Sequence, residues 1–291
     1  MENRLHTESV SIGYGDRLIV KELSVAIPDR RITTIIGPNG CGKSTLLKAM
    51  TRILQPQSGS VVLDGKSISR ENTKLLARKL AILPQTPEAA SGLTVGELVS
   101  YGRYPHQQGF GRLTKRDYEV IDWALQVTGT SDYKTRTVDA LSGGQRQRVW
   151  IAMALAQETE MIFLDEPTTY LDLAHQLEVL ELLQRLNEEE RRTIVMVLHD
   201  LNQAARFSDY IVAMKDGRIV KAGAPKEIMR RDVLKQVFRI DAEIGEDPRT
   251  GAPMCITYNL LNKGETEDEE NEENEENEVV MDTVAYAVAA R

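Results

Sequence analysis

The sequence has only two cysteines, Cys41 and Cys255, in 291 residues, and it contains no long apolar run. Two cysteines cannot form the disulfide framework of a small secreted protein, and they suit a reducing compartment. No stretch approaches the ~18 consecutive apolar residues that a membrane-spanning helix needs. The polar N-terminus, Met1–Arg4, lacks the apolar core of a secretion signal. We therefore expect a protein that stays inside the cell.

The sequence also lacks an excess of positive charge, since its net charge is −8. Ten acidic residues and no basic one lie between Glu265 and Glu278, so this run accounts for −10 and the rest of the chain carries +2. A nearly neutral body predicts neither a DNA-binding surface nor a polybasic membrane patch. Residues 263–291 contain this low-complexity Glu/Asn run and are predicted to form a disordered acidic tail.

Short apolar runs alternate with helical patterns along most of the chain. This alternation predicts an α/β fold whose mostly parallel sheet is covered on both faces. Strands are expected in Lys21–Ile36, Leu80–Leu83, Met161–Leu164 and Thr193–Leu198, helices in Thr45–Leu54 and Leu173–Asn187, and a hairpin from Ile211–Met214 to Arg218–Lys221.

The middle of the chain has a different texture, because residues 86–144 lack long apolar strands. Helical patterns at Val95–Tyr101 and Lys115–Val127 predict an α-helical insertion there. The α/β core with its β subdomain is assigned to residues 1–85 and 145–225. A C-terminal extension is assigned to residues 226–262, where a turn at Glu246–Pro253 separates two short strands. Residues 1–262 thus form one predicted domain, without an internal repeat.

A phosphate-binding loop is the first motif that carries chemistry. The pattern G-x-x-x-x-G-K-[ST] is matched by Gly37, Pro38, Asn39, Gly40, Cys41, Gly42, Lys43 and Ser44, with Thr45 next. The glycines let successive N–H groups face a phosphate at a helix N-terminus. Lys43 adds positive charge at the terminal phosphates, and the Ser44 hydroxyl can bind Mg²⁺. The alternative, a simple Gly-rich turn, is disfavoured by the strand before the loop and the helix after it.

Two acids follow the expected strand Met161–Leu164. Asp165 would lie beside the phosphate loop and hold Mg²⁺, and Glu166 would polarise the attacking water. Alone, the pair could equally be two solvated acids at a strand end, and the loop is what favours catalysis. His199 follows the strand Thr193–Leu198 at the same edge, where it could contact the γ-phosphate or be structural.

The segment Leu141-Ser142-Gly143-Gly144-Gln145 resembles the signature motif of the ABC ATPase family. With the loop, the two acids and His199, the chain has the family's motifs in order across residues 1 to 260. The resemblance implies a P-loop NTPase (RecA-like) core, an N-terminal antiparallel β subdomain and a helical insertion. It also implies that ATP and Mg²⁺ bind, and that Ser142–Gln145 contact the ATP held by a second copy of the chain. The residues themselves agree with this implication, because a helix that begins after Ser142 has an N-terminus that favours anions such as phosphate.

Other family positions carry over individually. Tyr14 resembles the aromatic residue that stacks on adenine, although it could belong to the core or surface. Gln85 resembles the glutamine that contacts Mg²⁺ and water and links the core to the insertion. The segment Thr169–Asp172 resembles a loop that contacts the opposite subunit, but Tyr170 replaces the more usual alanine.

Within the family, Gly102–His106, Trp150–Gln157 and Thr168–Gln176 resemble ATPases of iron–siderophore and vitamin B12 importers. This implies integral membrane permease subunits as partners, an extracytoplasmic substrate-binding protein as an indirect partner, and a place at the cytoplasmic face of the membrane. Alternatives are another importer (vitamin B12, haem or metal ion), an exporter, or an ABC ATPase acting on nucleic acid. The last lacks support, because the sequence has neither a long coiled coil nor tandem motif sets.

The insertion also carries apolar residues that could receive a permease helix. They are Leu93, Val95, Leu98, Val99 and Tyr101. The alternative is that all five form the insertion's own core.

Overall fold

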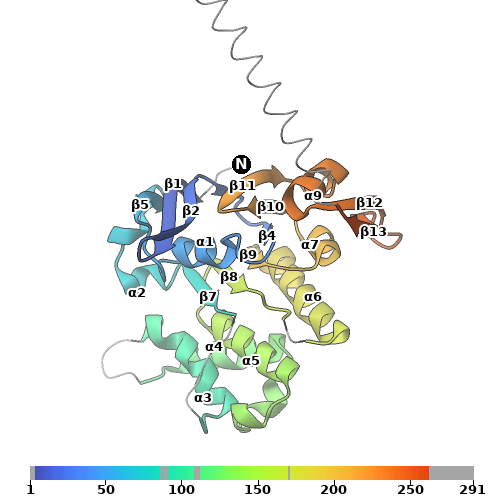
Figure 1. Cartoon of the computed structure of the whole chain (residues 1–291). Helices are drawn as coiled ribbons and strands as arrows, with labels where there is room; N and C mark the ends of the chain where they lie inside the picture. Colours follow the sequence, from blue (N-terminus) through green and yellow to red (C-terminus); the bar gives the residue numbers. More distant parts are fainter. Residues whose placement is uncertain (1–3, 86, 88–90, 108–111, 170, 262–291) are drawn as a thin grey trace, which may run out of the picture.

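The computed structural model describes residues 4–85, 87, 91–107, 112–169 and 171–261, and it begins with an antiparallel sheet (Figure 1). A two-residue turn joins its first strands, where Tyr14 pairs with Arg17 and Gly15 has a left-handed φ of 56°. This sheet confirms the predicted N-terminal antiparallel β subdomain. Its strands, in the order β2-β1-β5-β6 with β3 beside β1, are β1 (Leu5–Tyr14), β2 (Arg17–Leu23), β3 (Ala26–Ile27), β5 (Ser58–Leu63) and β6 (Lys66–Ser67).

The central sheet has the order β11-β10-β4-β9-β8-β7 among the described residues, and only the β10–β11 pair is antiparallel. Its mostly parallel arrangement and the predicted hairpin are confirmed. The single strand expected in Lys21–Ile36 is wrong, because Pro28 and the left-handed Arg30 (φ 56°) interrupt it between β3 and β4. The strands are β4 (Ile32–Ile36), β7 (Leu80–Leu83), β8 (Met161–Asp165), β9 (Thr193–Val197), β10 (Tyr210–Lys215) and β11 (Arg218–Gly223).

Two hydrophobic cores lie on opposite faces of the central sheet. Along β9, Val195 and Val197 join the core beneath α1 and the antiparallel sheet, whereas Ile194 and Met196 join the core beneath the longer helices. This alternation explains why the strand reads as a continuous apolar run: both of its faces are buried. The helices of the core are α1 (Lys43–Met50), α2 (Thr73–Leu76), α6 (Leu173–Glu190) and α7 (Leu201–Phe207), with the 3₁₀ turn η1 (Ile68–Arg70).

The middle of the chain forms a helical layer below the sheets in Figure 1, as predicted. Capping boxes start its three described α-helices: Thr94 with Glu97, Thr114 with Asp117, and Ser142 with Gln145. The predicted domain boundary after residue 144 falls inside α5, which packs against α3, α4 and β7. The elements are α3 (Val95–Ser100), η2 (Tyr101–His106), α4 (Lys115–Val127), η3 (Ser131–Tyr133), η4 (Val138–Ala140) and α5 (Gly143–Ala156).

The apolar residues offered for docking are mostly internal. Val95, Leu98 and Val99 are fully buried against α4 and α5, so their expected role as a free surface is wrong. They point inward because α3 needs its apolar face to join the insertion's own core. Leu93 is half-buried, and Tyr101, at 55% exposure, is the one large apolar member left open.

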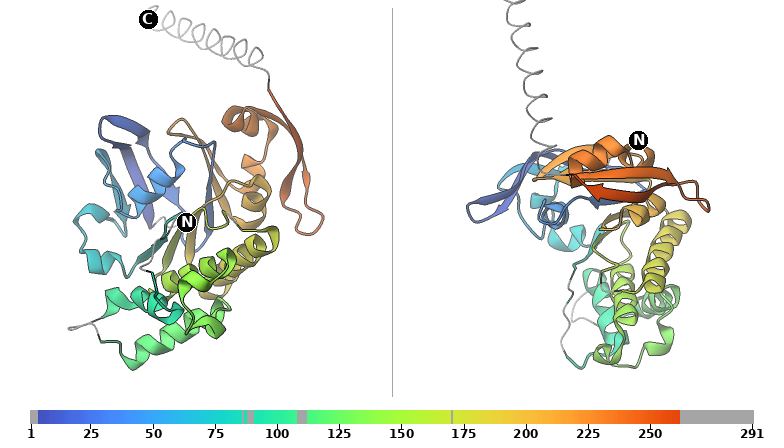
Figure 2. Two further views of the ribbon diagram at one scale, coloured as in Figure 1. Left: turned by 60° about the horizontal axis from the view of Figure 1, so that its bottom comes forward. Right: turned by 45° about the vertical axis from the view of Figure 1, so that its right-hand side comes forward.

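The C-terminal part packs beside the core as α8 (Pro225–Ile228), α9 (Arg231–Phe238) and a hairpin of β12 (Ile240–Glu246) and β13 (Pro253–Leu260) (Figure 2). The predicted turn at Glu246–Pro253 is confirmed, although the strands are longer than expected. Tyr170 and the acidic tail lie outside the described residues. No helix in the described ranges is long and apolar enough to cross a membrane.

Candidate functional site

The phosphate loop connects β4 to α1, as the motif predicts. Its backbone requires glycine at Gly37 (φ 151°) and Gly42 (φ 104°), because a Cβ on Gly37 would lie 2.2 Å from the Met214 carbonyl oxygen. Gly42 is also the residue before the first turn of α1, which leaves the helix N–H groups facing the loop. The Cys41 side chain instead packs in the core beneath the loop, where burial raises the pKa of its thiol.

Lys43 is buried and folds back onto the loop. Its Nζ donates to the carbonyl oxygens of Gly37 (2.8 Å) and Pro38 (3.1 Å). These bonds partly compensate a buried ammonium for the water it has lost. The side chain therefore holds a cation within reach of any anion that enters the loop.

Ser44, in the first turn of α1, meets Asp165, the last residue of β8. The Ser44 hydroxyl donates to Asp165 Oδ1 at 2.7 Å, and Asp165 is 2% exposed. Burial raises the pKa of the Asp165 carboxyl, and the Ser44 hydrogen bond opposes this shift. A hydroxyl and a carboxylate fit a magnesium ion that shares its other positions with phosphate and water. The described residues hold no cluster of three or more His, Cys, Asp or Glu side chains that could hold a metal ion.

Glu166 is the centre of the site. Its carboxylate accepts hydrogen bonds from Gln85 Nε2 (2.6 Å) and Thr169 Oγ1 (3.1 Å), and His199 Nε2 lies 2.6 Å from Oε1. The backbone of Glu166 has a left-handed φ of 53°, a conformation that costs a non-glycine residue about 1–3 kcal/mol and is often found at functional sites. Three strand ends (β7, β8 and β9) thus bring their following residues onto one carboxylate.

One cavity of ≈560 Å³ unites these groups. Tyr14 is exposed (53%) at its rim, where a flat ligand could stack. Arg17 and Ile19, which the sequence analysis missed, also line it. The tight turn after Tyr14 could have predicted both residues, because it returns the chain as β2 beside the phosphate loop. The lining residues are Tyr14, Arg17, Ile19, Asn39, Gly40, Gly42, Lys43, Ser44, Thr45, Gln85, Glu166, Thr169 and His199.

The signature segment is built as a helix start but does not line this cavity. Ser142 caps α5: its Oγ accepts from Gln145 N (3.3 Å), and its own N–H donates to Gln145 Oε1 (3.1 Å). Ser142 and Gly143 are exposed. The structure therefore places this N-terminus where a group outside the chain could reach it.

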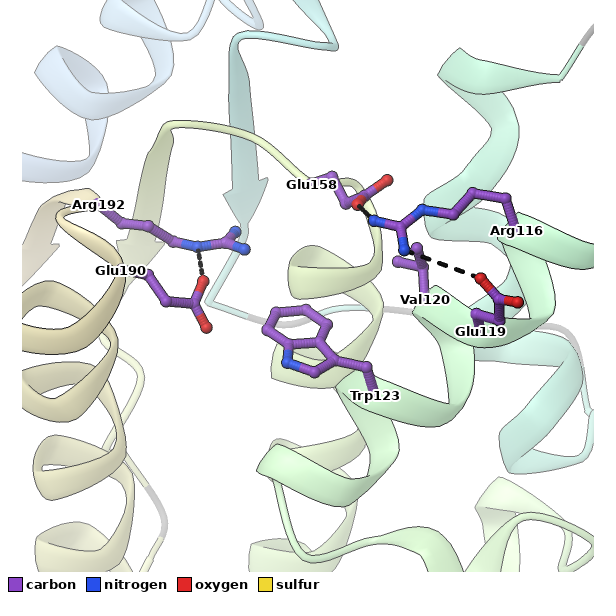
Figure 3. Close-up of a pocket in the computed structure, with 7 residues that line it drawn as sticks. All are labelled: Arg116, Glu119, Val120, Trp123, Glu158, Glu190 and Arg192. Atoms are coloured by element: carbon purple, nitrogen blue, oxygen red, sulfur yellow. Dashed lines mark hydrogen bonds and ion pairs between the residues drawn. The ribbon is translucent and has the colours of Figure 1, made fainter.

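A second crevice, of ≈350 Å³, lies between α4 and the core (Figure 3). Each charged side chain that lines it pairs with another: Arg116 with Glu158 (2.7 Å) and Glu119, and Arg192 with Glu190 (2.6 Å). The Arg192 guanidinium also lies 5.4 Å from the centre of the Trp123 ring. The Arg116–Glu158 pair and the Arg192–Trp123 contact cross this crevice and join α4 to the segments facing it. Because the charges of this crevice are already paired, the phosphate-loop cavity is the better ligand site.

Comparisons with known proteins agree with this geometry. A family profile described as ABC transporter matches residues 20–169. The chain is 63% identical to the iron(3+)-hydroxamate import ATP-binding protein FhuC of Bacillus subtilis, covering 91% of this chain and 98% of that protein. It is 47% identical to the ferric enterobactin transport ATP-binding protein FepC of Escherichia coli, covering 87% and 93%.

Solved structures extend the likeness to the fold. An inward-facing metal-chelate-type ABC transporter matches with a TM-score of 0.75 at 27% identity, over 90% of this chain and 99% of that one. A dimeric bacterial ABC transporter cassette matches with a TM-score of 0.69 at 29% identity, over 76% and 98%. The chain has a phosphate loop followed by the adjacent acids Asp165 and Glu166, of which Asp165 is bonded to Ser44 of the loop. It also matches its relatives along nearly their whole length. The chain therefore belongs to the ABC transporter family as one of its ATP-binding proteins.

Proposed function

We propose that this chain is the ATP-hydrolysing subunit of an ABC importer for iron(III)–siderophore complexes. The observation that carries the hydrolytic part is the Glu166 carboxylate, held at the phosphate-loop cavity by Gln85, Thr169 and His199. The cargo is inferred from relatives named for iron(3+)-hydroxamate and ferric enterobactin transport, since an importer's cargo passes through its other subunits.

ATP would place its phosphates in the loop from Gly37 to Thr45, with adenine against Tyr14. Lys43 would exchange its two carbonyl partners for the terminal phosphates, which satisfy the ammonium better because they are charged. Ser44 and Asp165 would hold Mg²⁺, with Gln85 near it. Bound there, the ion would neutralise charge on the phosphate oxygens.

For hydrolysis, Glu166 is the group that can orient a water molecule and take its proton. Gln85 contacts one of its oxygens and His199 the other, so the carboxylate keeps one orientation. Alternatively, His199 could donate the same Nε2–H to a γ-phosphate when ATP is bound. A positioned base of this kind contributes about 10²–10⁴-fold to rate.

The site needs a second copy of the chain. Ser142, Gly143, Gly144 and Gln145 lie outside the chain's own cavity, and their helix N-terminus would bind the γ-phosphate held by the partner. Two chains would then close on two nucleotides, and a cassette of the family with a similar fold is a dimer.

The dimer would work at the cytoplasmic face of the membrane, bound to permease subunits and acting indirectly with an extracytoplasmic substrate-binding protein. No nucleic acid is part of this function. The test is uptake of a radiolabelled ferric hydroxamate by cells lacking the chain, complemented with wild type or with Lys43→Ala. Uptake restored by wild type alone supports the proposal. Equal restoration by Lys43→Ala would contradict it, and restored cobalamin uptake without iron uptake would replace the cargo.

A further inference from the structure

An imidazole ring covers the second glycine of the signature segment. A Cβ placed on Gly144 would lie 2.7 Å from His175 Cδ2, 2.9 Å from Cγ and 3.2 Å from Nε2, so the ring rests directly on the Gly144 backbone. Gly144 is buried although its neighbours Ser142 and Gly143 are exposed. The half-buried ring thus packs against the backbone at the start of α5.

His175 is itself held by Asp172, the N-cap of α6. One carboxylate oxygen, Oδ1, accepts both from the His175 backbone N–H (2.9 Å) and from its ring Nδ1 (2.7 Å). Both bonds, the backbone bond most strongly, lower the pKa of the Asp172 carboxyl. The carboxylate therefore fixes the start of α6 and the orientation of the ring at the same time.

The same turn reaches back to the catalytic carboxylate. Thr169 donates from Oγ1 to Glu166 Oε2 (3.1 Å) and from its backbone N–H to the Glu166 carbonyl (3.2 Å). Asp172 follows Thr169 by three residues, and His175 contacts Gly144 from the first turn of α6. The segment that begins at the hydrolytic residue Glu166 thus ends, at His175, against the signature helix.

We propose that His175 is a positioning residue for the signature segment, which it holds in place for the nucleotide bound by the partner subunit. This inference rests on the proposed function, because it assigns His175 to the partner's site rather than to its own. The ring does not line the chain's own cavity, and it contacts a backbone that has no side chain to fix it.

Removing the ring should weaken turnover without weakening nucleotide binding to the isolated chain. His175→Ala opens space behind Gly144, and a displacement near 1 Å at a reacting group can cost about 10²-fold in rate. We expect kcat to fall by about 10–100-fold, with the ATP affinity of the monomer within about twofold of wild type.

A matched control comes from the next contact between the same helices. Arg148 of α5 pairs with Glu178 of α6, one turn beyond Gly144 and His175. Glu178→Gln weakens helix packing without touching the signature backbone, so kcat should change by less than about twofold, as for a partly exposed ion pair. A loss in Glu178→Gln equal to that in His175→Ala would overturn the proposal in favour of general helix packing.

Mixing experiments decide which site the ring serves. In a mixed dimer of His175→Ala and Lys43→Ala, one site joins an intact phosphate loop to an intact signature segment. If one working site suffices, an equal mixture should recover roughly a quarter of wild-type activity, because half of the dimers are mixed and each has one competent site of two. The control, His199→Ala mixed with Lys43→Ala, should not recover, because His199 acts beside its own loop.

The outcomes separate the two proposals. If the Ser142→Arg and Lys43→Ala mixture recovers but the His175→Ala mixture does not, His175 acts in its own site and this inference is wrong. If neither mixture recovers, one working site does not suffice or the two-chain site of the proposed function is wrong, and the kcat of His175→Ala against that of Glu178→Gln then decides the inference alone. Full activity of His175→Ala alone would also overturn it.

Discussion

Replacement of Glu166 by glutamine is the sharpest test of the hydrolytic site. The carboxylate accepts from Gln85 and Thr169 at one oxygen and meets His199 Nε2 at the other. A glutamine in that place offers one oxygen and one NH₂ group. The amide can accept at one atom only, where the carboxylate accepts at both oxygens, and the group can no longer take a proton from water.

The expected loss follows from the role of the residue. A positioned general base contributes about 10²–10⁴-fold, which corresponds to about 3–5 kcal/mol in the activation free energy. Nucleotide binding should change little, because the contacts that hold phosphate come from the loop and Lys43. ATP-bound Glu166→Gln should also accumulate as a dimer, since hydrolysis is what reopens the interface.

Phosphate release measures the loss in kcat, equilibrium binding of ATP measures the affinity, and size-exclusion chromatography with ATP measures the dimer. Glu119→Gln, an exposed acid on α4, serves as the control and should behave as wild type. Glu166→Gln with ATPase activity within threefold of wild type would refute the assignment of the base. A large loss of ATP affinity would show instead that the substitution disturbs the loop.

Three other outcomes follow from the same geometry. Lys43→Ala should weaken ATP binding at least tenfold in an equilibrium binding assay, because it removes the buried cation at the phosphate loop. Unchanged affinity would count against this loop as the phosphate site. Ser142→Arg should lose steady-state ATPase activity while its monomer still binds ATP, and mixing with Lys43→Ala should restore part of the activity; full activity of Ser142→Arg alone would rule out the partner's use of the signature. Asp165→Asn should raise the melting temperature of the nucleotide-free chain at pH 7 yet abolish Mg²⁺-dependent hydrolysis. Burial raises the pKa of Asp165 in the folded state, so ionising it lowers the free energy of unfolding as the pH rises from the unfolded pKa through the folded one. Asparagine has no charge and removes that cost. A lower melting temperature of Asp165→Asn at pH 7 would contradict this.

The local motifs were readable because their chemistry depends on neighbours in sequence. The phosphate loop needs glycines at fixed positions, and the structure gives Gly37 and Gly42 the left-handed φ values that the pattern implies. Continuous apolar runs marked β8 and β9 correctly, since strands buried on both faces show no alternation. The match of α4 to Lys115–Val127 has the same origin, because its N-cap and apolar period are local.

Other features depended on contacts between distant segments, and only the tertiary structure decided them. The convergence of Gln85, Thr169 and His199 on Glu166 requires the strand order β9-β8-β7, which no single segment encodes. Whether Val95, Leu98 and Val99 face solvent or core depends on how α4 and α5 pack, and hydrophobicity alone could not tell an internal face from a docking face.

The sequence by itself determined the chemistry of this protein: a loop for phosphate, two acids after a buried strand, and a capped helix start at Ser142. It did so because each of these requires specific residue types at a fixed local spacing. The tertiary structure decided which of them meet. It brought the loop and Glu166 into one cavity, left the signature segment outside it, and placed His175 against Gly144, because the distances between strand ends and helix starts follow from the packing of the whole sheet.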